Sequence, residues 1–245
     1  MLNYIKRLYY EVGKYENLAK TPTRVPKARR KVTEDLIRKH LKMQQIEEIL
    51  EIGTGSGYIT EVISKVIKEE NCNLSIMDFS ESFLETTRQL NIKLKNVYLN
   101  DIQDIDTALP QKFDLVVFQE ILEHLVSPFI AMQNINKFLN NNGIVVVSIP
   151  NSFYWRYFLS FIKSIIIGKK KSIKDTHITE LSPYGFIKLA SMAGFQIEQI
   201  FCYPCFYKGG LSILMGQEVL FLIRKVDEPE NCWKDLQDSI VHQWK

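Results

Sequence analysis

Residues 49–57 read Ile-Leu-Glu-Ile-Gly-Thr-Gly-Ser-Gly, and they are the most informative part of the chain. A short apolar run meets an acidic residue, three glycines spaced two apart follow, and a helix-like run occupies residues 58–67. The pattern predicts a buried parallel strand, a tight turn and a helix. Glycine in such a turn allows positive φ and lets the backbone approach a ligand closely. Glu51, at the end of the strand, would direct a carboxylate at that ligand, which suits a neutral or cationic small molecule better than a phosphate.

The spacing of the glycines narrows the choice of ligand. A dinucleotide fingerprint needs a third glycine three residues after Gly55, and Tyr58 stands there. A phosphate-binding P-loop needs a lysine after its last glycine, and none follows Gly57. The pattern E-x-G-x-G-x-G instead resembles motif I of the class I S-adenosylmethionine-dependent methyltransferases. A glycine-rich turn that binds no ligand remains the alternative.

Two further carboxylates fall at the ends of expected strands. Residues 73–77 read as a second strand that ends at Asp78, and an acidic residue there accepts hydrogen bonds from ribose hydroxyls. Residues 97–99 read as a third strand that leads to Asp101, the match to the family's contact with the adenine amino group. Either residue alone could be an ordinary loop carboxylate. The resemblance implies a cofactor site made of Glu51, Gly53, Thr54, Gly55, Gly57, Tyr58, Asp78, Phe79, Asp101, Ile102 and Gln119.

The segments that follow point to one branch of this family. Residues 113–118 read as a fourth strand and run into Gln-Glu-Ile-Leu-Glu-His-Leu at 119–125; residues 143–149 read as a fifth strand. They resemble the F-D-x-V-…-E-x-L-E-H and G-G-…-x-P-N segments of ubiquinone-biosynthesis O-methyltransferases and many sugar and polysaccharide methyltransferases. Asn142 replaces the first of the two glycines, a change that a turn tolerates. The pattern from Asp175 to Phe195 resembles the branch's D-x-H-…-S-P-…-A-G-F tail, and the likeness extends over residues 46 to about 201.

Composition and element order predict an α/β fold. The chain has 245 residues, of which 46% are hydrophobic and 24% are charged, both near globular averages. Strands alternate with helical runs up to residue 150, which predicts a mostly parallel sheet. The resemblance implies a Rossmann-like sheet of seven strands with helices on both faces and an antiparallel last strand at 217–226. We expect an N-terminal helical segment at 1–45 that is broken at Pro22 and Pro26, a methyltransferase domain at 46–227 with an acceptor-side insertion or lid at 152–181, and a C-terminal tail at 228–245.

Charge and hydropathy limit the partners. The formal net charge of +3 is too small to indicate nucleic-acid binding, and the basic runs at 27–31 and 169–171 are expected to be solvated. Lys6 and Arg7 interrupt the N-terminal apolar residues, so we expect no signal peptide. No segment approaches the roughly 20 apolar residues that span a bilayer. These features predict a cytoplasmic protein.

The segment 153–167 is dense in aromatic and aliphatic residues and lies where the family places acceptor-binding elements. A lid or wall of the acceptor site is the leading interpretation. A dimer contact and an interfacial helix whose lysines face anionic lipid are the alternatives. The oligomeric state is left open.

The cofactor's chemistry defines what the protein must supply. A sulfonium is already a good methyl donor, so we expect no metal, and Cys202-x-x-Cys205 lacks the second pair of a zinc site. The protein must align an acceptor lone pair with the methyl group and exclude water. An alcohol acceptor benefits from a general base. We assign that role to His124, just past the fourth strand, and acceptor orientation to His177, with a structural role for either as the alternative. His40 and His242 are expected at the surface, and the expected acceptor contacts are Glu120, Asn151, Tyr154 and Asp175.

The sequence therefore predicts an S-adenosylmethionine-dependent O-methyltransferase. The resemblance favours a hydroxyl of a sugar, nucleotide-sugar or surface-polysaccharide precursor as the acceptor. A small metabolite with a phenol, carboxylate or phosphate is the alternative acceptor. A catalytically silent cofactor-binding subunit is the alternative function, although Glu51, Asp78 and His124 are all present. A dinucleotide oxidoreductase is opposed by Tyr58 at the third-glycine position.

Overall fold

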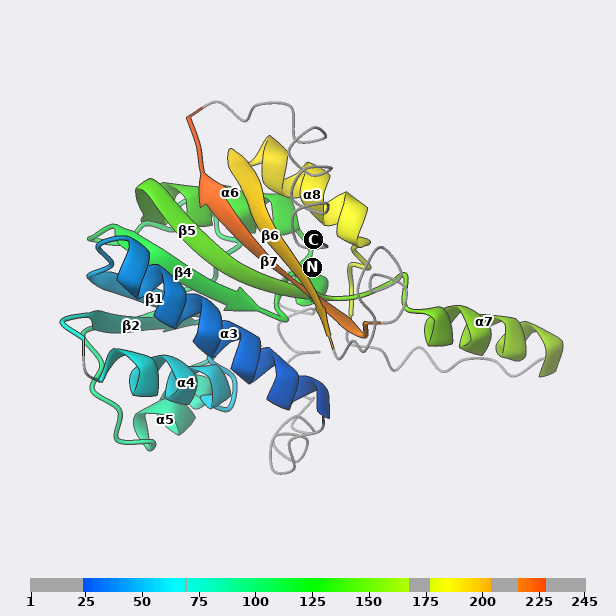
Figure 1. The fold of residues 1–245 in the computed structure, drawn as a ribbon, viewed down its shortest axis with the longest axis horizontal. Helices are drawn as coiled ribbons and strands as arrows, with labels where there is room; N and C mark the ends of the chain where they lie inside the picture. Colours follow the sequence, from blue (N-terminus) through cyan, green and yellow to red (C-terminus); the bar gives the residue numbers. More distant parts are fainter. Residues whose placement is uncertain (1–23, 69, 168–176, 204–215, 228–245) are drawn as a thin grey trace.

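A single seven-stranded sheet forms the centre of the protein. The computed structural model describes residues 24–68, 70–167, 177–203 and 216–227. Within these ranges the strand order is β3-β2-β1-β4-β5-β7-β6 (Figure 1). The first five strands pair in parallel, and β7 pairs antiparallel with both β5 and β6. This confirms the expected fold class. The strands are β1 (Glu48–Ile52), β2 (Asn73–Asp78), β3 (Val97–Leu99), β4 (Phe113–Gln119), β5 (Leu139–Pro150), β6 (Phe195–Tyr203) and β7 (Glu218–Lys225).

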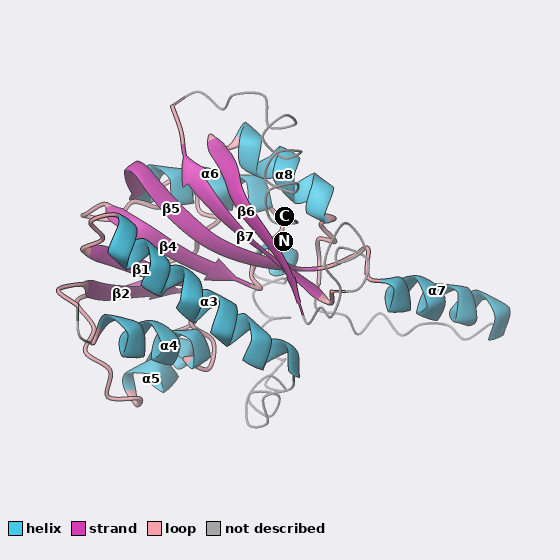
Figure 2. Cartoon of the chain, viewed as in Figure 1, coloured by secondary structure: helices cyan, strands magenta, loops and turns pink. Residues whose placement is uncertain are grey.

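Helices cover both faces of this sheet (Figure 2). One hydrophobic cluster packs α6 and α8 against the sheet, and a second packs α3, α4 and α5 against the other face. Strand β4 shows how the two are divided: Val116 and Phe118 belong to the first cluster, whereas Leu115 and Val117 belong to the second. Alternate side chains point to opposite faces, so a strand buried on both sides reads as a continuous apolar run. The helices are α3 (Arg24–Met43), α4 (Tyr58–Ile67), α5 (Glu81–Arg88), the 3₁₀ helix η1 (Leu122–His124), α6 (Pro128–Phe138), α7 (Trp155–Ile167) and α8 (Pro183–Met192).

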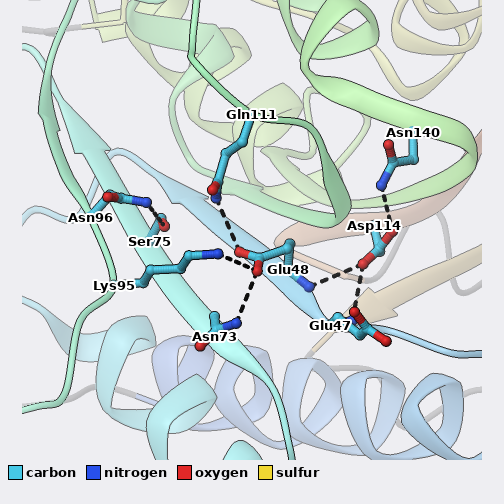
Figure 3. Close-up of polar contacts among 9 residues, drawn as sticks. All are labelled: Glu47, Glu48, Asn73, Ser75, Lys95, Asn96, Gln111, Asp114 and Asn140. Atoms are coloured by element: carbon cyan, nitrogen blue, oxygen red, sulfur yellow. Dashed lines mark hydrogen bonds and ion pairs between the residues drawn. The ribbon is translucent and has the colours of Figure 1, made fainter.

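Side-chain hydrogen bonds tie together the edge of the sheet where the parallel strands begin (Figure 3). The Glu48 carboxylate accepts from Asn73 Nδ2 at 2.9 Å, from Gln111 Nε2 at 3.0 Å and from Lys95 Nζ. Asp114 accepts from the backbone N–H groups of Glu47 and Glu48, at 2.9 and 3.0 Å, and from Asn140 Nδ2 at 2.7 Å. The polar groups of this edge are thus engaged in holding strands together. Ligands of open α/β sheets bind at the opposite, carboxyl-terminal edge.

The N-terminal region differs from its expected form. We expected Pro26 to break the helix, but α3 begins at Arg24 and continues through Pro26. Proline is tolerated in the first turn because the N–H groups there have no partner within the helix. Leu36 and Ile37 are buried, so α3 shares the core of the sheet, and the predictions for residues 1–23 lie outside the described residues. His40, expected at the surface, is only 5% exposed because it lies one turn after Leu36 and Ile37, on the packed face of this helix.

Helix α7 extends away from the sheet (Figure 1). Those of its side chains that the structure describes are all exposed, including Trp155, Leu159 and Ile166. In this arrangement the described part of α7 does not cover the carboxyl-terminal edge of the sheet, where a lid would have to lie. Across the ranges the structure covers, no helix combines the length and the apolar character that crossing a bilayer requires.

Candidate functional site

The glycine turn between β1 and α4 has the backbone that its sequence predicts. Gly53, Gly55 and Gly57 all have positive φ, at 78°, 49° and 75°. A Cβ on Gly53 would lie 2.2 Å from Ile121 Cδ1, and one on Gly57 would lie 2.4 Å from Leu90 Cδ1. A Cβ on Gly55 would meet no described heavy atom within 4 Å. A side chain at either outer glycine would have to displace an apolar neighbour, Ile121 or Leu90, whereas Gly55 faces open space that a ligand can fill.

Asp78 fastens this turn to the end of β2. Its Oδ2 accepts hydrogen bonds from Thr54 N at 2.8 Å, from Thr54 Oγ1 at 3.3 Å and from Gly55 N at 3.4 Å, and its Oδ1 accepts from Ser80 N at 3.0 Å. Burial raises the pKa of the Asp78 carboxyl, and these backbone N–H groups oppose the rise. A carboxylate offers about four lone-pair positions, so Oδ1 can accept a further donor. Asp78 therefore holds the turn, a role that the sequence did not reveal, and its ribose contact stays a prediction.

Glu51 is a buried carboxyl at the end of β1. It is 2% exposed, and its Oε2 has no hydrogen-bond partner among the described residues. Burial raises the pKa of Glu51 to about 8. A buried polar atom without a partner is costly unless something satisfies it. Glu51 can thus accept a hydrogen bond from a ligand donor, as its place in the sequence predicts.

The other residues expected to bind the cofactor make different contacts: some lie in loops, one is part of the core and two contact side chains of α3. Asp101 Oδ1 accepts from Gln103 N at 3.0 Å, and Ile102 is buried in the cluster beneath α6. Gln119, at the end of β4, donates from Nε2 to Thr33 Oγ1 at 2.7 Å, while its Oε1 has no hydrogen-bond partner in the described part of the chain. The Arg30 guanidinium lies 4.2 Å from the centre of the Tyr58 ring. Helix α3 therefore forms one side of the site, and Phe79 directly follows Asp78 at the end of β2.

A buried ion-pair cluster lies at the ends of β4 and β5 and the start of β7. Arg29 donates from Nε to Glu218 Oε2 at 2.8 Å and from Nη2 to Glu218 Oε1 at 2.5 Å, and the same Nη2 lies 3.3 Å from Glu120 Oε2. Ser148 Oγ donates to Glu120 Oε1 at 2.8 Å. Glu120 has a φ of 55°, unusual for a residue with a side chain. Burial raises the pKa of Glu120 to about 7, although Arg29 opposes the rise.

The sequence analysis identified Glu120 but missed Arg29 and Glu218. The basic run at 27–31 was expected to be solvated, yet the Arg29 side chain is only 17% exposed. Its two partners are far from it in the sequence, and no motif joins them. Only the docking of α3 on the sheet brings the three side chains together.

Glu123, His124 and His177 meet beyond the end of β4. The two histidine rings lie 5.0 Å apart at 68°, and His124 Nε2 lies 4.0 Å from Glu123 Oε1. One ligand atom from each of the three residues lies within 4.8 Å of the others, so the group can hold a metal ion. The sequence placed both histidines here but did not assign Glu123, which the E-x-L-E-H pattern contains.

Three further residues were predicted to contact the acceptor: Asn151, Tyr154 and Asp175. Asn151 is fully buried; its Nδ2 donates to Gly216 O at 2.7 Å and its Oδ1 accepts from Phe153 N at 3.1 Å. These bonds fix the chain after β5. Tyr154 is 7% exposed and packs edge-on against the rings of its neighbours in α7. Acceptor contacts by Asn151 and Tyr154 stay predictions, and Asp175 lies outside the described residues.

Comparison with known proteins gives a consistent result. The profile of a family described as a methyltransferase domain matches residues 18–200. A ubiquinone biosynthesis O-methyltransferase of Actinobacillus pleuropneumoniae serotype 7 is 24% identical over 163 residues, which cover 63% of this chain and 68% of that protein. A malonyl-[acyl-carrier protein] O-methyltransferase of Bacillus cereus is 29% identical over 102 residues, which cover 41% of this chain and 36% of that protein. The solved structure of the plantazolicin methyltransferase BpumL in complex with SAH has the same fold, with a TM-score of 0.59, 16% identity and 90% coverage of both chains.

Proposed function

Because the chain belongs to the methyltransferase-domain family and its cofactor is S-adenosylmethionine, we propose that it methylates a hydroxyl oxygen of a small-molecule acceptor. The bound cofactor supplies a methyl group activated by the sulfonium. The chain must hold the acceptor oxygen in line with that group, exclude water and remove the hydroxyl proton.

The residues of the glycine turn fit this cofactor. Gly55 leaves open space against the backbone, and Asp78 Oδ1 and Glu51 Oε2 are buried acceptor atoms beside it. Hydroxyl groups and an ammonium group are donors, so a ribose and an amino acid moiety suit these two carboxyls. Glu51 and Asp78 would hold the cofactor, and α3 would close over it through Arg30 and Thr33.

The pairing of His124 with His177 is the observation that carries the proposed acceptor chemistry. Both rings lie beyond the end of β4, and Glu123 adds a carboxyl beside them. A sugar hydroxyl loses its proton reluctantly at neutral pH, so groups that accept or displace that proton are needed at the acceptor oxygen. We propose that these three side chains form that activating group, in which His124 contacts the reacting oxygen or its proton and His177 orients the acceptor.

The favoured acceptor is a hydroxyl of a sugar, nucleotide-sugar or surface-polysaccharide precursor, as the motif pattern indicates. A phenolic hydroxyl is the second candidate, favoured by the ubiquinone biosynthesis O-methyltransferase among the relatives. A carboxylate or phosphate acceptor fits less well, because it would add negative charge to a region where three carboxyls already share one guanidinium. These carboxyls belong to Glu120, Glu123 and Glu218, and the guanidinium belongs to Arg29.

An acceptor panel tests this proposal. The protein would be incubated with methyl-labelled S-adenosylmethionine and neutral sugars, nucleotide-sugars, catechols or small carboxylates, and products would be analysed by mass spectrometry. We expect an added methyl group on the oxygen of a hydroxylated compound. Methyl transfer only to carboxylates, or only to nitrogen, would contradict the proposal.

A further inference from the structure

The cluster of Glu123, His124 and His177 combines three ligand types in one small space. Two imidazole nitrogens and a carboxylate oxygen lie within 4.8 Å of one another. The Glu123 side chain is 4% exposed and that of His124 is 17% exposed. Glu123 is thus shielded from bulk water and His124 is half-buried, whereas His177 is exposed, so the cluster is open to solvent on the His177 side.

Backbone hydrogen bonds hold the two segments that carry these residues. The N–H groups of Ile178 and Thr179 donate to Glu123 O at 2.8 and 3.0 Å, and Thr179 Oγ1 donates to Leu125 O at 2.7 Å. The segment after His177 is thus fastened to η1, which carries Glu123 and His124. A metal site needs ligands that are held in place in advance, and these contacts provide that support.

The surrounding charge also favours a cation. Two buried carboxyls, those of Glu123 and Glu218, and the partly buried carboxyl of Glu120 lie near one guanidinium, that of Arg29. Arg29 is engaged with Glu218 and Glu120, whereas Glu123 Oε2 is buried and has no hydrogen-bond partner among the described residues. A buried carboxyl of this kind is costly unless it is paired.

We propose that Glu123, His124 and His177 bind a divalent metal ion at the acceptor end of the site. Two histidines and one carboxylate leave coordination positions open for oxygen atoms of an acceptor or water. Imidazole nitrogen favours Fe²⁺, Ni²⁺ or Zn²⁺ over Mg²⁺ and Ca²⁺, which prefer oxygen ligands, and Mn²⁺, which also binds carboxylate oxygen, serves here as the paramagnetic probe. This departs from the sequence expectation that no metal is needed and makes His124 a metal ligand in place of a general base.

The proposed site has a consequence for the reaction. A divalent ion beside the acceptor would orient its oxygen and favour loss of the hydroxyl proton to solvent. This consequence rests on the proposed O-methylation, whereas metal binding itself does not and can be measured without an acceptor.

Binding of Mn²⁺ to chelator-treated protein tests the site directly. Electron paramagnetic resonance would follow the loss of the free Mn²⁺ signal for the wild type and for the Glu123→Gln, His124→Gln and His177→Gln variants. The Glu85→Gln variant is the matched control, because Glu85 is an exposed carboxyl on α5, outside the cluster. We expect one Mn²⁺ per chain, binding about tenfold or more weaker in each cluster variant, and unchanged binding in the control.

Two further measurements distinguish failure of the proposed metal site from failure of the proposed function. Titration with S-adenosylhomocysteine, the cofactor product, should give the same affinity in wild type and cluster variants, which shows that the variants are folded. Mg²⁺ should displace Mn²⁺ only at large excess. Absence of Mn²⁺ binding in the wild type, equal binding by the folded cluster variants, or displacement by equimolar Mg²⁺ would overturn the metal site. Failure of the wild type to bind S-adenosylhomocysteine would instead count against the proposed function.

Discussion

Arg29 and Glu218 form a two-point ion pair, with N–O distances of 2.8 and 2.5 Å, that joins α3 to the start of β7. The same guanidinium reaches Glu120 after β4. One side chain of the helix before the first strand thereby connects two strands of the sheet at the edge where the cofactor and acceptor would meet. The assembly of the site therefore depends on the docking of α3.

Replacing Arg29 should destabilise the fold strongly. Arg29→Ala would leave Glu218 and Glu120 buried without their cation, and loss of one partner of a buried pair costs about 3–5 kcal/mol. Urea unfolding at neutral pH would measure this loss. Arg38→Ala is the control, because Arg38 pairs with Glu34 on the exposed face of the same helix and should cost only about 0.5 kcal/mol. A similar, small loss for both variants would mean that the Arg29 cluster contributes little.

The buried Glu51 carboxyl should make the protein less stable as the pH rises. Its folded-state pKa of about 8 lies above its usual value of 4.5, so its contribution to stability is fully present below pH 4.5 and is lost as pH rises through 8. Glu51→Gln stays neutral throughout. We expect the free energy of unfolding of the variant to exceed that of the wild type increasingly between pH 4.5 and 8, by an amount on the order of a few kcal/mol. Urea unfolding of the two ligand-free proteins at a series of pH values measures this difference in the free energy of unfolding. A difference that stays constant with pH would contradict the prediction.

Gly55 and Gly53 should respond differently to the same substitution. A side chain at Gly55 enters open space, so Gly55→Val should fold, with a strain cost of about 1–2 kcal/mol from its positive φ, yet lose binding of S-adenosylhomocysteine. Gly53→Val should lose stability more severely because its Cβ would overlap Ile121. Calorimetric titration and thermal unfolding would distinguish the two effects. Normal cofactor affinity in Gly55→Val would place the ligand elsewhere.

Asp78 should contribute to cofactor affinity. If Asp78 accepts both ribose hydroxyls, Asp78→Ala should lose about 2–3 kcal/mol of binding free energy, which corresponds to roughly 30- to 150-fold weaker binding. The variant also loses the acceptor for Thr54 N and Gly55 N, so part of this loss would reflect a looser turn. Asp78→Asn keeps one acceptor oxygen for the turn and should bind with intermediate affinity. An unchanged dissociation constant in Asp78→Ala would move the ribose contact to another residue.

The sequence predicted the sheet and the glycine turn because each of these features is determined by a short continuous segment of the chain. The strand before Gly53, the positive φ of the turn glycines and the carboxyls at the ends of β1 and β2 follow from short segments whose geometry is fixed by their own sequence. Asn142, which replaces a glycine, has a φ of 61° but lies within β5, where the register of pairing with β4 shifts.

The contributions of distant segments could not be predicted in this way. The burial of Arg29 and His40 depends on which face of α3 docks, and the helical pattern alone does not reveal the partners on that face. The approach of His177 to Glu123 depends on the backbone bonds made by the residues after His177. The exposed position of α7 shows the same limit, because an apolar segment can be assigned to a lid only when its partner surface is known.

Single-turnover transfer of a labelled methyl group tests whether the histidine pair activates the acceptor hydroxyl. Wild type and His124→Gln, each loaded with methyl-labelled S-adenosylmethionine, would be mixed with the hydroxyl acceptor found in the panel, and labelled product would be measured over time. We predict rapid product formation in the wild type and a rate about 10²- to 10⁴-fold lower in the variant at saturating acceptor, with unchanged affinity for S-adenosylhomocysteine. Equal rates of product formation in the two proteins would contradict the assignment of His124, His177 and Glu123 to acceptor activation.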